Sequence, residues 1–475
     1  MLSFATPCDP VIRRGWWGKC EWYPMRRFDA YEMLKTGRNV FLTGPAGSGK
    51  TFLLNRYVEY LHRHKVGVGI TAPTGIAATH LNGRTIHSWV GMGINETLDD
   101  AQLGKLLKKK ELRRRVRETS VLVIDEISML NAARLDLVDL ICKAIRQDLR
   151  PFGGMQVVFC GDFYQLPPVA RDGQDSRFAV ESAAWQTANV AVCYLEEQFR
   201  QTDERFLRVL NDIRQNQVSD ATQEILRERL HQPVPAGMEP TKLHTHNQDV
   251  DAYNLFRLRK LHGEETSYEM QASGPAPLVE ELKKGCLAYP LLQLKLGAIV
   301  MFVKNNFSRG YVNGTVGTVI GYDEDSEFPI VETVRGGNII ASPESWTIEE
   351  QDKVIASISQ VPLRLAWAMT VHKSQGMTLD CAEIDLSQTF EYGMGYVALS
   401  RVRTLGSIKL IGLNDMALQV NDFVINLDAQ LRKRSEEDVV ALREMGLTAR
   451  KSWQRDFLTR CHQTMSMLSF ARMRE

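Results

Sequence analysis

The sequence predicts an α/β protein built on a parallel sheet with helices on both faces. Short apolar segments at residues 40–43, 66–72, 120–124 and 155–160 have the length and the residue types of buried strands. Helical patterns lie between these segments, as at residues 130–150. Because strands that alternate with helices favour parallel pairing, we expect one such domain over roughly residues 28–190.

The composition is that of an ordinary globular protein of about three domains. The 475 residues include 58 Lys and Arg against 57 Asp and Glu, so any nucleic-acid surface must be local. No apolar run approaches the ~20 residues of a membrane helix, and no secretory signal is evident. The eight cysteines contain no CxxC pair, which favours a reducing compartment. We therefore expect a cytoplasmic protein without a membrane partner, associated with the nucleoid if it is bacterial, with a nuclear or mitochondrial location as the alternative.

The second half of the chain again has an α/β pattern, and it also contains a segment with a different, all-β pattern. Residues 190–195 and 407–411 are strand candidates, whereas residues 232–240 and 272–277 have the composition of loops. Between residues 297 and 361, apolar segments alternate with Asn-Gly and Gly-Gly turns. This pattern predicts a small antiparallel unit inserted into α/β sequence. Residues 428–475 are charged and predict a helical tail.

Residues 44–51 read Gly-Pro-Ala-Gly-Ser-Gly-Lys-Thr and fit the pattern G-x-x-x-x-G-K-[ST]. A strand precedes them and a helix follows, as a phosphate-binding loop requires, which disfavours a simple glycine turn with an exposed lysine. The loop backbone turns its N–H groups onto phosphate oxygens, Lys50 reaches the β- and γ-phosphates, and Thr51 binds Mg²⁺. The predicted nucleotide-binding residues of this loop are Gly44, Ala46, Gly47, Ser48, Gly49, Lys50 and Thr51.

Two acidic residues, Asp125 and Glu126, follow the apolar segment 121–124. A carboxylate at the end of a parallel strand lies beside the phosphate-binding loop. Asp125 is placed to hold Mg²⁺ through water, and Glu126 to take a proton from the attacking water. Paired acids favour hydrolysis over phosphotransfer, whereas the alternative is a strand that runs into a solvated acidic turn.

Other candidate residues are less specific. Gln165, in the segment 161–169, follows the fourth strand and can contact the γ-phosphate, although a loop ended by proline explains it as well. Arg200 and Arg401 lie in the second half, where a neighbouring domain can supply arginines to the transferring phosphate. A lone arginine is more often a surface ion pair. A basic segment predicts a helical projection that either contacts DNA phosphates or is simply solvated. It contains Lys105, Lys108, Lys109, Lys110, Arg113, Arg114, Arg115 and Arg117.

Taken in order, these motifs resemble the helicase motif series of superfamily 1, group B, and in particular the PIF-type (petite integration frequency) DNA helicases. The segments that carry the resemblance are 44–51, 71–78, 85–89, 124–130, 161–169, 199–201, 370–378 and 396–401. The stretch 128–154, and residues 296–301 followed by 312–314, are also similar to that family. The resemblance covers roughly residues 28–415.

The resemblance implies an enzyme, an ATPase that moves 5′ to 3′ on single-stranded DNA and unwinds tailed or forked duplex, with ATP and Mg²⁺ as cofactors. G-quadruplex DNA is a further candidate partner, and a monomer is expected at rest. Two RecA-like domains are implied, at 28–190 with a small insert near 91–117, and at 191–301 with 362–427. An SH3-like β insertion is implied at 302–361, between an N-terminal segment 1–27 and the tail.

The resemblance also assigns roles to residues. Gln165 senses the γ-phosphate, Arg200 and Arg401 act as arginine fingers, and Gly376 joins the nucleotide site. The residues in motifs that line the DNA channel are Pro73, Thr74, Gly75, His87, Ser88, His372, Ser374 and Gln375.

Two departures and three alternatives stay open. The family's adenine-reading Gln is not evident at residues 27–31, so the preference for ATP over GTP is not assigned, and Pro45 offers no N–H to phosphate. A translocase that remodels nucleoprotein without unwinding would share every ATP residue. A nucleotide-switched DNA-binding module is disfavoured by Glu126 and the two arginines. A P-loop kinase or ring-forming ATPase is disfavoured by motifs that extend through Arg401.

Overall fold

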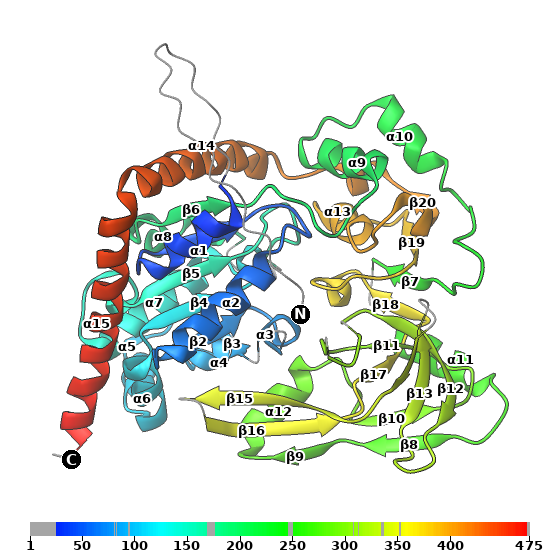
Figure 1. Ribbon diagram of the computed structural model, residues 1–475, viewed down its shortest axis with the longest axis horizontal. Helices are drawn as coiled ribbons and strands as arrows, with labels where there is room; N and C mark the ends of the chain where they lie inside the picture. The colour runs from blue at the N-terminus through cyan, green and yellow to red at the C-terminus, as the bar shows by residue number, and fades with distance from the viewer. Residues whose placement is uncertain are drawn as a thin grey trace, which may run out of the picture.

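The computed structural model describes residues 25–472 except 80, 82, 94–95, 169–175, 246–249, 307, 312, 334–336 and 351–352. Most of the expected N-terminal segment 1–27 therefore lies outside the described residues, as do Val169 and Val312 of the motif segments. Figure 1 shows two α/β domains side by side, a β-rich unit below the second, and two long helices along the outside of the first.

The first domain is built on a parallel sheet with strand order β3-β2-β4-β5-β1-β6. The predicted strands are confirmed, and most of their residues are buried because helices cover both faces. The predicted domain boundary at residue 190 precedes β6, yet β6 pairs with β1, so this sheet extends through Tyr194. The strands are β1 Val40–Thr43, β2 Val68–Ala72, β3 Arg84–Thr85, β4 Val121–Ile124, β5 Gln156–Cys160 and β6 Ala191–Tyr194.

Side chains of β1 alternate between two apolar clusters, one on each face of this sheet. Val40 and Leu42 belong to one cluster and Phe41 to the other, as the two-residue period of a strand requires. The predicted helix at 130–150 is present, and the basic segment 105–117, predicted to be helical, lies in α5 and α6. The helices of this domain are α1 Arg27–Lys35, α2 Lys50–Arg63, α3 Gly75–Thr79, α4 Ile86–Trp89, α5 Asp100–Leu107, α6 Lys110–Glu118, α7 Ala132–Arg146 and α8 Ala183–Thr187, with the 3₁₀ turns η1 Ile127–Met129, η2 Pro151–Gly154 and η3 Ala179–Glu181.

The second domain has its own parallel sheet, with strand order β18-β7-β19-β20. The expectation of two domains with parallel sheets is therefore confirmed, and the strand predicted at 407–411 is β20. The strands are β7 Thr241–His244, β18 Ala368–Thr370, β19 Ala382–Leu386 and β20 Ile408–Leu413. The helical elements are α9 Glu204–Arg214, α10 Asp220–Arg227, α11 Val250–Arg259, η4 His372–Ser374, α13 Met394–Leu399, η5 Leu405–Ser407 and η6 Asp415–Leu418.

An antiparallel unit lies between β7 and β18, as the alternating turns predict. It begins before residue 302, because β8 already pairs with β10, and residues 272–277 contain the end of β9 and the start of α12 rather than a loop. Its likeness to an SH3 fold stays a prediction. The elements are β8 Thr266–Glu269, β9 Gln271–Ser273, α12 Ala276–Gly285, β10 Leu291–Leu294, β11 Ile299–Phe302, β12 Val316–Tyr322, β13 Pro329–Thr333, β14 Asn338–Ile340, β15 Glu344–Glu350, β16 Lys353–Gln360 and β17 Leu363–Leu365.

The tail returns to the first domain as two helices, α14 Asp422–Glu444 and α15 Gly446–Arg472. Helix α14 covers the outer edge of β6, where Ser435 Oγ accepts a hydrogen bond from the Tyr194 N–H at 3.0 Å and Asp438 accepts one from the Val192 N–H at 2.9 Å. Side chains of α15 join the apolar cluster beneath α1 and α2. The helical tail is thus confirmed, and it completes the first domain.

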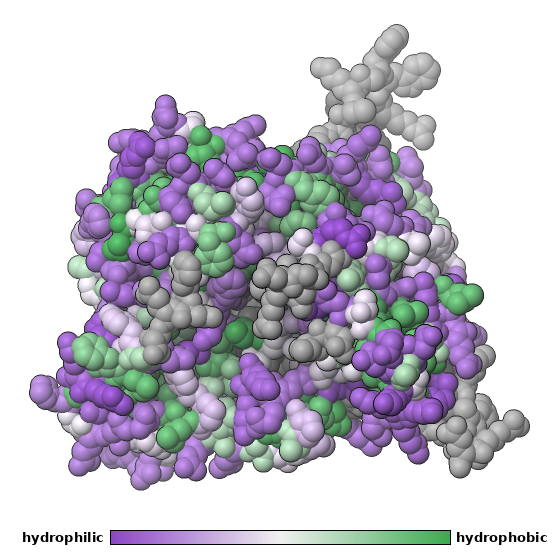
Figure 2. Space-filling model, turned by 180° about the vertical axis from the view of Figure 1, so that it is seen from behind, coloured by the Kyte–Doolittle hydropathy of each residue, from purple (hydrophilic) through white to green (hydrophobic). Residues whose placement is uncertain are grey.

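Figure 2 shows a mainly hydrophilic face on which hydrophobic residues form small separate groups. Within the described part of the chain, no helix has both the length and the apolarity needed to cross a membrane. Cys142, Cys160 and Cys193 are buried free cysteines.

Candidate functional site

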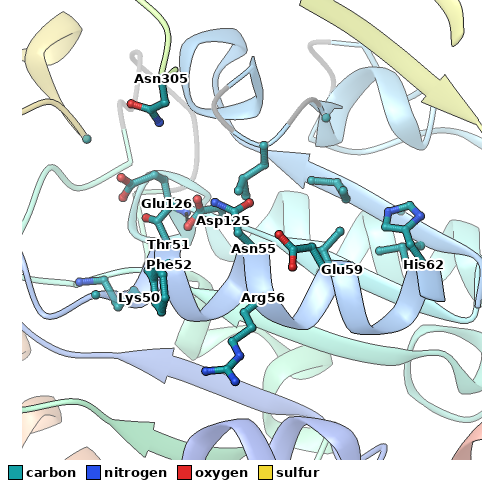
Figure 3. Close-up of a pocket in the computed structure, with 18 of the residues that line it drawn as sticks. Lys50, Thr51, Phe52, Asn55, Arg56, Glu59, His62, Asp125, Glu126 and Asn305 are labelled. Carbon is teal, nitrogen blue, oxygen red and sulfur yellow. Dashed lines mark hydrogen bonds between the residues drawn. The ribbon is translucent and has the colours of Figure 1, made fainter. Parts of the chain in front are cut away.

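A cavity of about 1370 Å³ brings together most of the predicted nucleotide residues. Figure 3 shows its wall along α2, with Lys50 and Thr51 near Asp125 and Glu126. The first domain contributes Ala46, Gly47, Gly49, Lys50, Thr51, Asp125, Glu126 and Gln165, whereas Arg200, Gly376 and Arg401 reach the cavity from the segment after β6 and from the second domain. Ser48 and Gly44 lie buried in the loop behind it.

The phosphate-binding loop has the backbone that its glycines predict. Gly47 has a φ of +87°, and a Cβ there would lie 2.6 Å from the Cβ of Arg200, so conformation and space both require glycine. The Lys50 ammonium donates to the carbonyls of Gly44 at 2.8 Å and Pro45 at 3.1 Å. Its charge is therefore held at the mouth of the loop, where phosphate oxygens of a nucleotide would lie.

The two acids stand at the carboxyl end of β4. Burial raises the pKa of Asp125, whose carboxylate accepts the Glu126 N–H at 2.9 Å. Burial, and then the neighbouring Asp125, raise the pKa of Glu126 to about 7. A carboxylate with this pKa is suited to accept a proton near neutral pH. Glu126 also has a left-handed backbone, with a φ of +48°, which sets it apart from the preceding strand.

Gln375 links the acid pair to Gln165. Its side-chain amide donates to Glu126 at 3.1 Å and to the Gln165 carbonyl oxygen at 3.3 Å. Gln375 is 7% exposed. The DNA contact expected of Gln375 stays a prediction, and in this structure its side chain contacts two residues that line the cavity. The segment after β18 in the second domain therefore touches the residues predicted to activate water and to sense the γ-phosphate.

The two predicted arginine fingers lie close together at the domain boundary. Arg401 donates to the carbonyls of Val397 at 2.8 Å and Ser374 at 3.2 Å, and burial, followed by the nearby Arg200, lowers its pKa to about 9. Arg200 donates to the Ser400 carbonyl at 3.1 Å, and burial lowers its pKa to about 10. Burial of two guanidiniums side by side is costly without an anion, and a nucleotide phosphate would relieve that cost.

A buried network that the sequence did not predict supports this cavity. Arg214 donates to Asp162 at 2.6 Å and to the Tyr396 hydroxyl at 3.1 Å. The Tyr396 hydroxyl in turn accepts the Ala46 N–H at 3.0 Å. The N–H of Ala46, which we predicted to bind phosphate, is thus occupied by a side chain of the second domain. The sequence signal that could have indicated this network is Arg214 itself, which lies on the apolar face of α9 next to Ile213.

The same network reaches the tail. Arg214 donates to the Tyr194 hydroxyl at 3.0 Å, and that hydroxyl donates to Asp428 of α14 at 2.7 Å. Arg432 of α14 donates to the Tyr194 hydroxyl at 2.7 Å. Both domains and the tail therefore meet at one polar cluster beside the phosphate-binding loop.

The predicted DNA-contact residues of the first domain lie just before α3, at its start and on α4, and these two helices are beside α12 (Figure 1). Pro73 is buried, and the Thr74 hydroxyl accepts the Ala77 N–H at 3.2 Å. Ser88 donates to Glu281 of α12 at 2.5 Å. Burial, and then Arg134, lower the pKa of His87 to about 4, so this imidazole is neutral at pH 7.

The predicted DNA-contact residues of the second domain differ from one another in how exposed their side chains are. His372 is part-exposed and lies 3.8 Å from Glu391, and burial lowers its pKa. Ser374 is fully buried and its hydroxyl donates to the Val371 carbonyl at 2.7 Å. The Ser374 side chain is therefore engaged within its own turn and does not face a surface that DNA can reach in this structure.

An aromatic and basic cluster to which the sequence assigns no role flanks the phosphate-binding loop. The Arg27 guanidinium stacks on the Phe199 ring, 4.0 Å from its centre, and pairs with Glu197 at 3.1 Å. Both side chains approach Gly49 within 4 Å of where its Cβ would be. Phe52 is 61% exposed nearby. Aromatic faces beside a phosphate site are suited to a nucleotide base.

Comparisons with known proteins agree with this geometry. The family model described as "PIF1-like helicase" matches residues 28–225, and the model for the Pif1 helicase 2B domain matches residues 277–322. The ATP-dependent DNA helicase Pif1 of Psychrobacter sp. (strain PRwf-1) is 44% identical over 473 residues, covering 87% of this chain and 72% of the relative. This chain belongs to the PIF1-like helicase family. The family resemblance inferred from the motifs is confirmed, and the expected class of enzyme, an ATP-dependent DNA helicase, is that of the family.

This chain matches only part of the length of its relatives. The human ATP-dependent DNA helicase PIF1 is 39% identical over 400 residues, which cover 84% of this chain and 62% of the human protein. The chain thus spans less than two thirds of that relative.

Solved structures of a Bacteroides Pif1 match along nearly their whole length. The complex with ADP-AlF4 is 29% identical, has a TM-score of 0.75, and covers 88% of this chain and 99% of that chain. The complex with single-stranded DNA is 30% identical over the same shares of both chains, with a TM-score of 0.59. By TM-score, this chain is therefore more similar to the ADP-AlF4 complex than to the complex with single-stranded DNA.

Proposed function

We propose that this chain is an ATP-driven helicase that translocates 5′ to 3′ on single-stranded DNA and unwinds tailed or forked duplex. The observation that carries the proposal is the shared cavity, where Lys50 and Glu126 of the first domain face Arg200 and Arg401. The names of the relatives support the same activity, and the Bacteroides complexes support ATP and single-stranded DNA as ligands. G-quadruplex DNA stays a predicted partner.

The residues beside the phosphate-binding loop fit Mg²⁺. Thr51 and Asp125 offer a hydroxyl and a carboxylate, the oxygen ligands that this ion prefers. Burial raises the pKa of Asp125 even though the Lys50 ammonium lies nearby, and a bound cation would favour the charged form of this carboxylate. Among the described residues, no group of three or more His, Cys, Asp or Glu side chains could hold a metal. A site with two protein oxygen ligands suits Mg²⁺, because this ion takes few ligands from the protein and completes its shell with water and nucleotide phosphates. When bound, Mg²⁺ would neutralise the negative charge that develops on the phosphates.

The side chains around the cavity supply the remaining chemistry. Glu126 accepts a proton from the attacking water, and Gln165, which lines the cavity from the loop after β5, would contact the γ-phosphate. Arg200 and Arg401 stabilise negative charge on the transferring phosphoryl group. Because Gln375 and Arg401 come from the second domain, this assignment makes domain closure and hydrolysis depend on each other.

The test is strand separation on two duplexes, one with a 5′ single-stranded tail and one with a 3′ tail, in the presence of ATP and Mg²⁺. We expect unwinding of the 5′-tailed duplex alone, and its loss in Lys50→Ala. Unwinding from the 3′ tail would refute the direction. Hydrolysis stimulated by DNA without strand separation would point instead to a translocase that remodels nucleoprotein.

A further inference from the structure

Helix α12 of the antiparallel unit covers two of the predicted DNA-contact positions on the first domain. Figure 1 places α12 beside α3 and α4, at the boundary between the unit and the first sheet. At the end of α12, Gly285 lies so close to Gly75 that a Cβ on Gly75 would be 2.4 Å from the Cα of Gly285. The side of Gly75 on which a Cβ would lie is therefore covered by the end of α12, and the residue is half-buried.

One turn earlier on α12, the Glu281 carboxylate lies among the polar groups of β3 and α4. One of its oxygens accepts the Ser88 hydroxyl at 2.5 Å, and the other accepts both the N–H and the hydroxyl of Thr85 at 3.1 Å each. The Arg84 guanidinium lies 3.5 Å from the carboxylate, and this ion pair is largely buried, with side-chain exposures of 6% and 16%. A single anionic group is thus held by a cation, a backbone N–H and two hydroxyls.

This set of donors suits a phosphodiester as well as a carboxylate. Both groups carry one negative charge shared between two oxygens. Arginine, serine and threonine hydroxyls, and backbone N–H groups are the usual contacts of proteins to DNA phosphates. The family resemblance implies a DNA contact for Ser88, whereas the sequence assigns no role to Arg84 or Thr85.

We propose that Arg84, Thr85 and Ser88 form a subsite for one phosphodiester of the DNA strand, and that Glu281 occupies this subsite until the strand displaces it. The proposal rests on the proposed function, because it takes single-stranded DNA as the ligand. A phosphate and the carboxylate cannot share the donors, so α12 must leave α4 when DNA binds. The better match to the ADP-AlF4 complex than to the DNA complex of the Bacteroides relative is in keeping with an occupied subsite.

The proposal predicts that DNA binding is weakened by the free energy of releasing Glu281. The experiment measures the affinity of a fluorescein-labelled oligothymidylate by anisotropy without nucleotide, for the wild type, Glu281→Gln and Glu280→Gln. The two variants remove one negative charge from adjacent positions of α12. Glu280, however, is exposed and pairs with Lys283 on the same helix at 2.9 Å, so it serves as the matched control. We expect Glu281→Gln to bind about 10-fold more tightly and Glu280→Gln to stay within about 2-fold of the wild type.

A second arm tests the subsite itself with Ser88→Ala. In the wild type this change removes a contact to Glu281 together with a contact to DNA, so the two effects oppose each other and the affinity changes little. In the Glu281→Gln background only the DNA contact is lost, and we expect the affinity to fall roughly 5-fold. The same loss in both backgrounds would show that Glu281 and DNA do not compete for Ser88, and would overturn the proposal.

The remaining outcomes separate this inference from the proposed function. If the wild type and Glu281→Gln bind single-stranded DNA equally well, or the variant binds less tightly, competition by Glu281 is refuted while the proposed function stands. If none of the folded proteins binds single-stranded DNA, the proposed function fails, and the inference fails with it. Thermal unfolding of each variant establishes that the proteins compared are folded.

Discussion

Replacing Arg214 with Met should destabilise the protein strongly, because it leaves a carboxylate buried without its cation. Arg214 is 4% exposed and Asp162 is 1% exposed, and their charged atoms are 2.6 Å apart. Removing one partner of such a pair costs about 3–5 kcal/mol. At about 2 °C per kcal/mol for a large chain, the midpoint of thermal unfolding should fall by roughly 6–10 °C.

The assay is thermal unfolding followed by circular dichroism, with Arg205→Met as the control. Arg205 lies on the same helix and makes an equally short ion pair, to Glu228 at 2.5 Å, but both side chains are about half exposed. Because solvent screens that pair, its loss should leave the midpoint unchanged within error. A drop for Arg214→Met that is no larger than the drop for Arg205→Met would refute the reasoning.

A double variant tests the cause of the loss. Adding Asp162→Asn to Arg214→Met removes the unpaired charge while it keeps the acceptor that the Tyr164 N–H uses. If an uncompensated carboxylate is the main cost, the double variant should unfold at a higher temperature than Arg214→Met alone. If the double variant unfolds at a lower temperature, packing of the arginine stem, rather than its charge, dominates.

Three further predictions follow from the site and the surface. Glu126→Gln should keep nucleotide and DNA affinity but abolish ATP turnover, and full turnover in a hydrolysis assay would remove Glu126 as the base. Replacing the exposed lysines Lys108, Lys109 and Lys110 with Gln should lower DNA affinity and reduce the slope of log K against log salt by about 2, and an unchanged slope would make that segment a solvated helix. His87 has a folded-state pKa of about 4 against 6.5 in a free side chain. The unfolded chain therefore binds the proton first, and stability falls as the pH drops from about 6.5 to 4, by up to about 3 kcal/mol. Unfolding midpoints at pH 7.5 and 5 should differ less for His87→Gln than for the wild type, and equal differences would rule out this contribution.

The parts of the fold that the sequence predicted are those that local chemistry determines. The loop at 44–51 needs its glycines and Lys50 at fixed spacing, so the pattern and the structure coincide. The strands of the first sheet are buried on both faces, and their continuous apolar residues identify them directly. Because β4 could be identified from its apolar residues, the sequence also predicted that the acids at its end lie beside the loop, and the structure has them there.

The parts that the sequence did not predict depend on pairings between distant residues. Gln375 reaches Glu126 across 249 positions, and Arg214 reaches Asp162 across 52. A residue type and its neighbours say little about which distant group it meets after two domains close on each other. Strand β6 resembles any apolar strand, and only its pairing with β1 assigns it to the first sheet.

The return of the tail to β6 has a consequence for the order of folding. The first domain includes contacts such as that between Arg38 and Asp438, which are 400 positions apart. During synthesis the first sheet is therefore made early, but its outer edge stays open until the second domain, the antiparallel unit and α14 have all emerged. An open edge strand is a template for pairing with other chains. Ending translation before α14 would thus leave an aggregation-prone edge, and the last helices act as the closing step of the first domain's assembly.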